Sequence, residues 1–567
     1  MKKLITLLIA GILSVGALVF PGCAPKTGLE SGDNVINVKV LSTGYGTEYI
    51  YNLKEKFEET FAEKGYKVNV LAPLEDLTGE KIIQEIYAND VTADLYFTNA
   101  GASTFCESEL GIMIESLEDV YNSKPIGFDG KEENITIREK LDATKVNYGE
   151  SFDGTEYTFP YVAGYSGLAV NVKLLSDPAI DSEIPVTTNE FFKVYEKIMA
   201  ITNETNIRPM TYSVSGNGYP TTAVNTWQVQ YGGMKEYDIF NSFENEDGTS
   251  MDCRKTNCDG SNCNGHVWEV FNSEAVLEAL TAFYTQLDYN TAALGSSSQG
   301  FTAAQQQLMT GSAAFMNNGT WLLNEEKDRH KDYLNDVSFM RIPLLSSVGI
   351  KMFGQGSKYN LSDDKCEEVL STIAKNADLN KNVDEIKTIV KSSCGLDIDE
   401  ADVKEVCEKR GYIDNQSGSP AVLSKKAQNK ELAKLFLRFI ASNDAGKVFA
   451  EASYNLSPWC ADAFEDSELT WFKDLMSIYN NQYTSTFAQK DPKGFRRDLG
   501  LAVLYPWAGD VVSNKILEQN YKFSIYDDNT KQMKGNYSEY KEKAKAFQKN
   551  IVDHAYEMMT TNGWTVI

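Results

Sequence analysis

Residues 35–46 read VINVKVLSTGYG, and this stretch decides the fold class. Apolar and polar residues alternate over 35–41, as they do in a β-strand with one buried face. The turn residues 42–46 interrupt that pattern, and apolar side chains four residues apart over 49–61 then predict a helix. The stretch is therefore a strand–loop–helix unit.

The same alternation continues along the chain. Residues 66–71 predict a second strand, 79–88 a helix and 94–97 a short third strand. Alternating strands and helices favour parallel pairing, and ligands of open α/β sheets collect at the carboxyl ends of the strands. The loops that hold Tyr45 and Asn99 are therefore candidate pocket walls, and ordinary turn chemistry is the alternative interpretation.

The composition excludes several classes of protein. With 567 residues, 42% of them hydrophobic, the chain can bury a large core, and its length indicates two to four domains or one large two-lobed unit. Its formal charge of -26 repels nucleic acid and anionic lipid surfaces, so we expect no nucleic-acid partner. A neutral ligand is the default expectation, and no sequence feature calls for a cofactor.

The amino terminus indicates export. Two lysines precede the uncharged apolar run 4–20, which is shorter than a membrane-spanning helix. The run leads into Gly22-Cys23, which resembles a bacterial lipoprotein processing site, although Phe20 and Pro21 depart from the usual pattern. We expect a signal peptide over 1–22 and a lipidated Cys23 that holds the protein to the outside of the cell membrane. An uncleaved anchor is the alternative.

The cysteines are compatible with an oxidising environment, because eight remain once Cys23 is set aside. One group is closely spaced and could form disulfides, a structural metal site or free thiols, and it consists of Cys253, Cys258, Cys263 and His266. Cys394 and Cys407 are expected on helices that a disulfide could bridge. The remaining three, Cys106, Cys366 and Cys460, receive no assignment.

Most catalytic motifs are missing from the sequence. It has three histidines and no G-x-S-x-G nucleophile elbow, and its glycine pairs lack the later glycine of a phosphate-binding loop. We therefore expect a protein that is not an enzyme. A glycoside hydrolase needs only two suitably placed carboxylates, so a surface glycosidase is the enzyme alternative.

Several stretches together resemble the extracellular solute-binding proteins of carbohydrate ABC importers, the group related to maltose-binding protein. The most specific is QLMTGSAAFM at 307–316 followed by GTW at 319–321. The others are DGTEYTFPY at 153–161, GLAVNVK at 167–173, PVTTNEF at 185–191 and NKELAKLFLRFIAS at 429–442. The resemblance covers about 36–345 and 420–515. The Cys-rich segment 236–266 and the segment 356–418, which has a helical pattern, are insertions by comparison.

The resemblance implies an α/β, two-lobed periplasmic-binding-protein-like fold with multiple interlobe crossovers and ligand in the cleft. We expect a tether at 23–34, the first lobe at 35–160 and 346–455, and the second lobe at 161–345 and 456–567. It also implies a monomer that captures an oligosaccharide outside the cell and delivers it to an ABC importer permease. A surface adhesin that uses the two insertions is a third reading.

Sugar recognition needs aromatic platforms beside planar polar groups. By resemblance, Trp321 and Trp507 match positions where the family stacks sugar rings. The further candidates are Trp227, Tyr45, Asn99, Tyr165, Asp510 and Trp459. The alternative for each aromatic residue is ordinary core packing.

Overall fold

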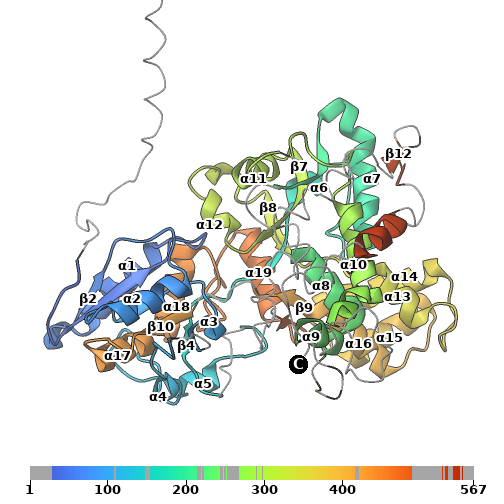
Figure 1. Cartoon of the computed structure of the whole chain (residues 1–567). Coiled ribbons are helices and arrows are strands. Elements are labelled where there is room, and N and C mark those ends of the chain that lie inside the picture. The colour runs from blue at the N-terminus through green and yellow to red at the C-terminus, as the bar shows by residue number, and fades with distance from the viewer. Residues whose placement is uncertain are drawn as a thin grey trace, which may run out of the picture.

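The computed structural model describes residues 28–552 with internal gaps. The ranges left out are 107–109, 147–153, 214–218, 220–221, 243–244, 246, 248, 250, 252–266, 289, 297, 416–419, 488–525, 528–529, 531, 534–539 and 550–551. Figure 1 shows two α/β bodies side by side, here called the first lobe (left) and the second lobe (right). The expected two-lobed α/β fold is confirmed.

The first lobe is built on a five-stranded sheet of order β2-β1-β3-β10-β4. β1 (Val35–Val40) runs parallel to β2 (Lys67–Val70) and to β3 (Leu95–Phe97), as the alternation predicts. β10 (Pro420–Leu423) then pairs antiparallel with both β3 and β4 (Thr158–Pro160).

Helices cover both faces of this sheet. The side chains of Ile36 and Val38 face α1 (Glu48–Thr60), whereas Tyr96 on the neighbouring strand faces α2 (Gly79–Ala88). α2 begins where the sequence predicts, because the Thr78 hydroxyl accepts a hydrogen bond from the Lys81 amide at 3.4 Å and caps the helix. The remaining helices are η1 (Ala62–Lys64), α3 (Ala102–Cys106), α4 (Glu118–Tyr121), α5 (Ile137–Lys140), α17 (Lys430–Ile440) and α18 (Asn443–Ser453).

The second lobe is built on a six-stranded sheet around β5 (Ser166–Asn171). Three strands pair antiparallel with β5, namely β7 (Ala313–Gly319), β8 (Val337–Met340) and β9 (Tyr412–Asp414). Two further strands extend the sheet. β6 (Arg208–Thr211) pairs parallel with β7, and β11 (Ser485–Phe487) pairs parallel with β9.

Helices of different lengths pack on the second sheet and enclose a core that includes Phe191, Phe315 and Trp227. They are α6 (Val172–Leu175), α7 (Thr188–Thr205), α8 (Thr222–Gly232), α9 (Met234–Ser242), η3 (Val267–Asn272), α10 (Glu274–Gln286), α11 (Phe301–Met309), α12 (Leu322–Glu326), η4 (Lys331–Tyr333), α13 (Ser346–Phe353) and α19 (Thr470–Tyr479). Tyr540 and Phe547, from the last described helical segment, join the same core. A separate two-stranded ribbon is formed by β12 (Tyr526–Asp527) and β13 (Gln532–Met533).

The described chain crosses between the sheets three times. It passes from β4 in the first sheet to β5 in the second, from β9 back to β10, and from α18 on the first lobe forward to β11. These passages are the multiple interlobe crossovers that the resemblance implies.

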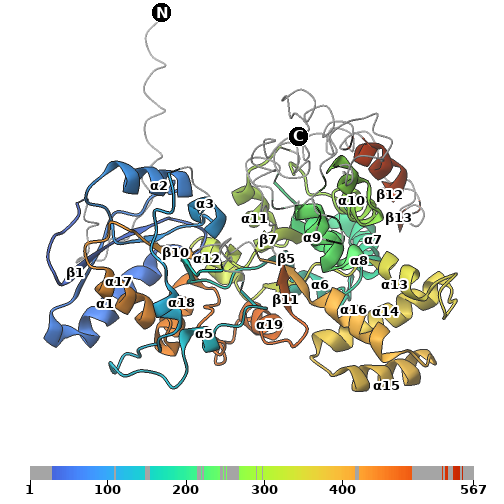
Figure 2. The same cartoon turned by 60° about the horizontal axis from the view of Figure 1, so that its bottom comes forward.

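The insertion predicted over 356–418 forms three helices, α14 (Asp363–Asp378), α15 (Val383–Cys394) and α16 (Glu400–Gly411). The sequence analysis predicts that residues 346–455 belong to the first lobe. This prediction is wrong for the stretch from α13 to β9, which belongs to the second lobe. These helices share the core of the second lobe and lie on its side away from the first lobe in both views (Figures 1 and 2). The buried Arg410 guanidinium binds Asp378 on α14, with Nη2 2.7 Å from Oδ2, and the Ile342 carbonyl at 2.9 Å.

The proposed bridge between Cys394 and Cys407 is also wrong, because both carry free, buried thiols. The Cys394 sulfur faces the Thr372 hydroxyl at 3.4 Å, whereas the Cys407 thiol lies beside Tyr483. Burial raises the pKa of the Cys407 thiol to about 12, so it stays protonated near neutral pH. Cys366 and Cys460 are free and buried as well, and Cys106 is buried.

Three further features bear on the sequence predictions. Within the described ranges, no helix is both long and apolar enough to cross a bilayer. The same ranges hold no cluster of three or more His, Cys, Asp or Glu side chains suited to a metal ion. Cys23 and the group Cys253, Cys258, Cys263 and His266 lie outside the described residues.

Candidate functional site

The two lobes meet where β7 of the second sheet leads into α12. Trp321 lies in this connection, and its indole packs edge-on against Tyr45 of the first lobe, with ring centroids 5.9 Å apart. Its Nε1–H donates to the Tyr219 hydroxyl at 3.1 Å. A side chain on Gly44 would come within 2.8 Å of the indole, so the absence of a Cβ at this position lets the two lobes approach.

Hydrogen bonds and an ion pair also connect the α12 region with the first lobe. The Asn324 amide donates to the Gly44 carbonyl at 2.7 Å. The Lys327 ammonium donates to the Ala452 carbonyl at 3.0 Å and lies 3.4 Å from a Glu48 carboxylate oxygen, so α12 touches two separate parts of the first lobe. We call this set of contacts around Trp321 the lobe junction.

A carboxyl group is half-buried at the lobe junction. Glu325 is enclosed near Tyr45 and Tyr219, and its Oε2 accepts a 2.5 Å hydrogen bond from the Gln305 amide. Burial raises the pKa of Glu325 from its ordinary value of 4.5 to about 7, and the neighbouring Glu326 carboxylate adds to the rise. This group can therefore change its charge within the physiological range of pH.

Several buried polar side chains of the second lobe have no hydrogen-bond partner in the described structure. Among them are the Ser166 hydroxyl and the amides of Asn317 and Gln228, and each of these three residues is at most 2% exposed. Ser166 pairs with Gly319, and Leu168 pairs with Asn317, so Ser166 and Asn317 lie on one face of the sheet at the end nearest the chain crossing. Unsatisfied buried polar groups are costly, so this set is a candidate for polar ligand contacts.

The predicted site residues fall into distinct places. Tyr45 and Trp321 are brought together at the lobe junction, and Asn99 is exposed at the end of β3. Trp227 and Tyr165 are fully buried, and their polar hydrogens are donated to the carbonyls of Pro343 and Lys145. Trp459 is buried and stacks on Phe159 of the first lobe, while Trp507 and Asp510 lie outside the described residues.

Sequence reasoning missed Glu325, Gln305, Tyr219 and the buried group around Asn317. One signal was present, because the pair Asn317-Asn318 lies near the end of a strand, just before the Gly319-Thr320-Trp321 segment. The role of Glu325 had no local signal, since its burial depends on contacts between segments far apart in the chain.

Two cavities of the second lobe border the insertion rather than the lobe junction. One has a volume of about 990 Å³ and is lined by parts of α7, α10, α13 and α14. The other, of about 720 Å³, lies between the insertion and the segment around Tyr412 and Tyr483. Neither is lined by Trp321 or Tyr45, so cavity size alone does not point to the junction.

Two sheets linked by three crossings, with an aromatic and polar junction between them, define the class of two-lobed binding proteins. Residues 52–369, more than half of the chain, match the family described as bacterial extracellular solute-binding protein, and the chain belongs to this family. No curated protein matches the chain significantly in sequence.

Solved structures show the same fold at low sequence identity. A probable secreted solute-binding lipoprotein from Streptomyces coelicolor is 12% identical, with a TM-score of 0.54, covering 91% of this chain and 99% of that one. The GacH receptor of Streptomyces glaucescens, solved unliganded and with acarbose, is 13% identical, with a TM-score of 0.53 and coverages of 92% and 99%. RafE from Streptococcus pneumoniae is 11% identical, with a TM-score of 0.53 and coverages of 93% and 100%, and RafE has also been solved with raffinose.

Proposed function

We propose that the protein captures an oligosaccharide between its lobes and delivers it to an ABC-type importer, without making or breaking a bond. The observation that carries the proposal is the lobe junction, where Trp321 and Tyr45 meet next to the end of β7 that holds the buried Asn317 and faces Ser166 on β5. Aromatic rings suit the C–H faces of a sugar, and amides and hydroxyls suit its hydroxyl groups. The acarbose and raffinose complexes of GacH and RafE support this ligand class.

Within this proposal Trp321 and Trp507 are the stacking residues, and Tyr45, Asn99 and Asp510 are further contacts. Trp227 and Tyr165 are completely buried, so the proposed site does not rest on them, whereas Trp321 and Tyr45, 8% and 5% exposed, would meet a ligand when the lobes separate. A ligand that touches both lobes would bind the closed arrangement more tightly than the open one and would therefore favour closure. The permease would recognise the closed arrangement.

The proposal includes the place of the protein in the cell. A monomer anchored through a lipidated Cys23 would face the outside, with residues 23–34 as its tether. Membership of an extracellular solute-binding family and the Gly22-Cys23 site support this assignment. The group Cys253, Cys258, Cys263 and His266 would be cross-linked by disulfides or a metal ion, and intact mass with metal analysis on fresh protein distinguishes these states from free thiols.

The deciding experiment is a panel of oligosaccharides tested by thermal shift and then by calorimetry. Ligand that binds only the native state raises the melting temperature with concentration, by RT ln(1 + [L]/Kd) in free energy. We expect at least one oligosaccharide to bind and to be recovered intact after prolonged incubation. Hydrolysis products would favour the glycosidase alternative, and no binding across the panel would favour the adhesin.

A further inference from the structure

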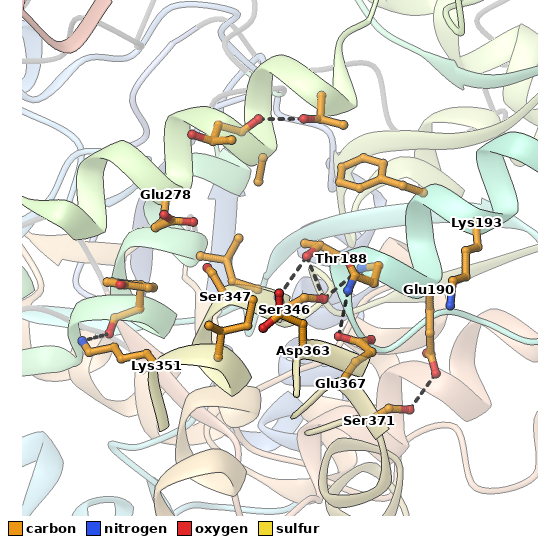
Figure 3. Close-up of a pocket in the computed structure, with 18 of the residues that line it drawn as sticks. Thr188, Glu190, Lys193, Glu278, Ser346, Ser347, Lys351, Asp363, Glu367 and Ser371 are labelled. Carbon is orange, nitrogen blue, oxygen red and sulfur yellow. Dashed lines mark hydrogen bonds between the residues drawn. The ribbon is translucent and has the colours of Figure 1, made fainter. Parts of the chain in front are cut away.

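The larger of the two cavities lies wholly within the second lobe (Figure 3). α7 and α10 of the lobe form one side of it, and α13 together with α14 of the insertion forms the other. Its volume of about 990 Å³ is in the range that small-molecule sites occupy. Its lining residues include none from the lobe junction, so any ligand here would be separate from one held between the lobes.

Hydroxyl groups and one carboxyl form the floor of this cavity. The Thr188 and Ser346 hydroxyls lie 3.2 Å apart, and the Ser346 hydroxyl also accepts the Asn189 amide hydrogen at 3.0 Å. Glu367, from the insertion, reaches the same place, where it accepts the Thr187 hydroxyl hydrogen and a 3.2 Å hydrogen bond from the Asn189 side chain. The donors described around Glu367 are neutral.

The electrostatic balance of the cavity favours a positively charged occupant. Its lining holds eight carboxylates and three lysines. Lys541 is already paired with Glu278 on α10, and the Lys351 ammonium lies 4.3 Å above the Tyr231 ring. In the described structure no lysine or arginine comes within ion-pair distance of Glu367, and burial raises the pKa of its carboxyl.

The apolar part of the lining also separates this cavity from a sugar site. The aromatic residues of the lining offer no platform, because Phe192 is 1% exposed and the face of Tyr231 is taken by Lys351. Ile350, 44% exposed, supplies an apolar wall.

We propose that this cavity is a second binding site, for an aliphatic amine. The ammonium group would donate to the Glu367 carboxylate, with the exposed carboxylates of Asp363 and Asp364 on the same wall, and the methylene chain would lie along Ile350. A charge-assisted hydrogen bond to a partly buried carboxylate is stronger than one between neutral groups, which gives the amine its advantage over a neutral polyol. This site is independent of the proposed oligosaccharide site.

Calorimetry of the full-length protein with spermidine and 1,4-diaminobutane tests the proposal, with 1,4-butanediol as the uncharged match. We expect saturable binding of at least one amine, no binding of the diol, and no competition with an oligosaccharide. Glu367→Gln, which keeps the size and one acceptor, should weaken amine binding at least about tenfold. The matched control Glu431→Gln removes an equally charged carboxylate from the exposed surface of the first lobe and should leave binding unchanged.

Folding of the variants is checked by denaturant midpoints. Because Glu367 also holds the start of α7, the double change Asp363→Asn with Asp364→Asn serves as a second test, since both side chains line the cavity and are exposed. It should weaken amine binding about threefold or more without lowering the midpoint. Equal losses in the cavity variants and in Glu431→Gln would show general attraction to an acidic protein and overturn the proposal. No amine binding at millimolar concentration would overturn it as well, whatever the result with oligosaccharides.

Discussion

The ionisation of Glu325 should make closure of the lobes depend on pH. Its carboxyl is buried by the approach of the first-lobe loop around Gly44, and burial raises its pKa from 4.5 to about 7. Because the pKa is higher at the lobe junction than in water, the closed arrangement binds the proton more tightly, and closure takes up a proton. Low pH therefore favours closure of the lobes. The free-energy penalty of closure grows as the pH rises from about 4.5 to about 7.

The size of the effect follows from the pKa difference. A rise of about 2.5 pH units corresponds to roughly 3 kcal/mol between the ionised and protonated forms. Only part of this belongs to closure, because Glu325 is partly exposed and Gln305 lies in the same lobe and stays beside it when the lobes separate. We assign somewhat less than half of this free-energy difference, about 1.4 kcal/mol, to contacts with the first lobe. This amount corresponds to a tenfold change in affinity for a ligand that requires closure.

The assay is calorimetric titration of an oligosaccharide ligand between pH 5 and pH 8. Titrations near pH 6.5 in buffers of different ionisation enthalpy should show a fraction of a proton taken up on binding. Glu325→Gln, which is uncharged throughout, should bind with the same affinity at both ends of the range. Other charged or titratable groups around Glu325 are Tyr45, Tyr219, Glu326 and Arg329, and the tyrosines stay protonated because burial raises their pKa values.

His330→Gln is the matched control because the His330 ring bonds to Glu326, the neighbour of Glu325 on α12. His330→Gln should keep the pH dependence that Glu325→Gln loses. An affinity that is flat from pH 5 to pH 8 in the wild type, or a slope that survives in Glu325→Gln, would refute the reasoning.

Four other expectations concern the stacking residues, the core, the insertion and the amino-terminal anchor. Trp321→Ala and Trp507→Ala should each weaken oligosaccharide binding by roughly 1 to 3 kcal/mol, about 5-fold to 150-fold by calorimetry. Trp227→Ala should instead lower stability by about 3 to 5 kcal/mol in denaturant titrations, and an unchanged affinity with a sharply lowered midpoint in Trp321→Ala would make that residue core packing as well. Arg410→Met removes the ion pair that joins α16 to α14 within the insertion and the hydrogen bond from Arg410 to the Ile342 carbonyl, and should cost about 2 to 4 kcal/mol in the same titrations, whereas a loss under about 1 kcal/mol would show that apolar packing alone suffices. Cys23→Ser should move the protein from the membrane to the soluble fraction, and retention with an intact amino-terminal peptide would indicate an uncleaved anchor.

Local patterns predicted local structure well. The strand at 35–41 and the helix at 79–88 were readable because their periodicity and caps lie within a few residues. The insertion was predicted as helical for the same reason, but its docking on the second lobe was not, because an amphipathic pattern shows that a face is buried and not what covers it. Whether an aromatic side chain is core or site is equally non-local, as the burial of Trp227 shows.

The lobe junction was the hardest part to predict. Trp321 and Tyr45 were both named as candidates, yet no pattern indicated that they touch each other. The pKa of Glu325 depends on residues from several segments that meet only in the folded chain. Spacing within a window cannot reveal such contacts, so the sequence could suggest aromatic candidates and could not suggest this carboxyl.

The three crossings have a consequence for how the chain is assembled. The second sheet takes β5 to β9 from one uninterrupted stretch, whereas the first sheet needs β10 to pair with β3, roughly 300 residues earlier. The first lobe therefore cannot complete its sheet until most of the polypeptide has emerged on the far side of the membrane. For the same reason no single cut divides this protein into two self-sufficient halves, and a fragment ending before residue 420 would leave the open edge of β3 exposed to other chains.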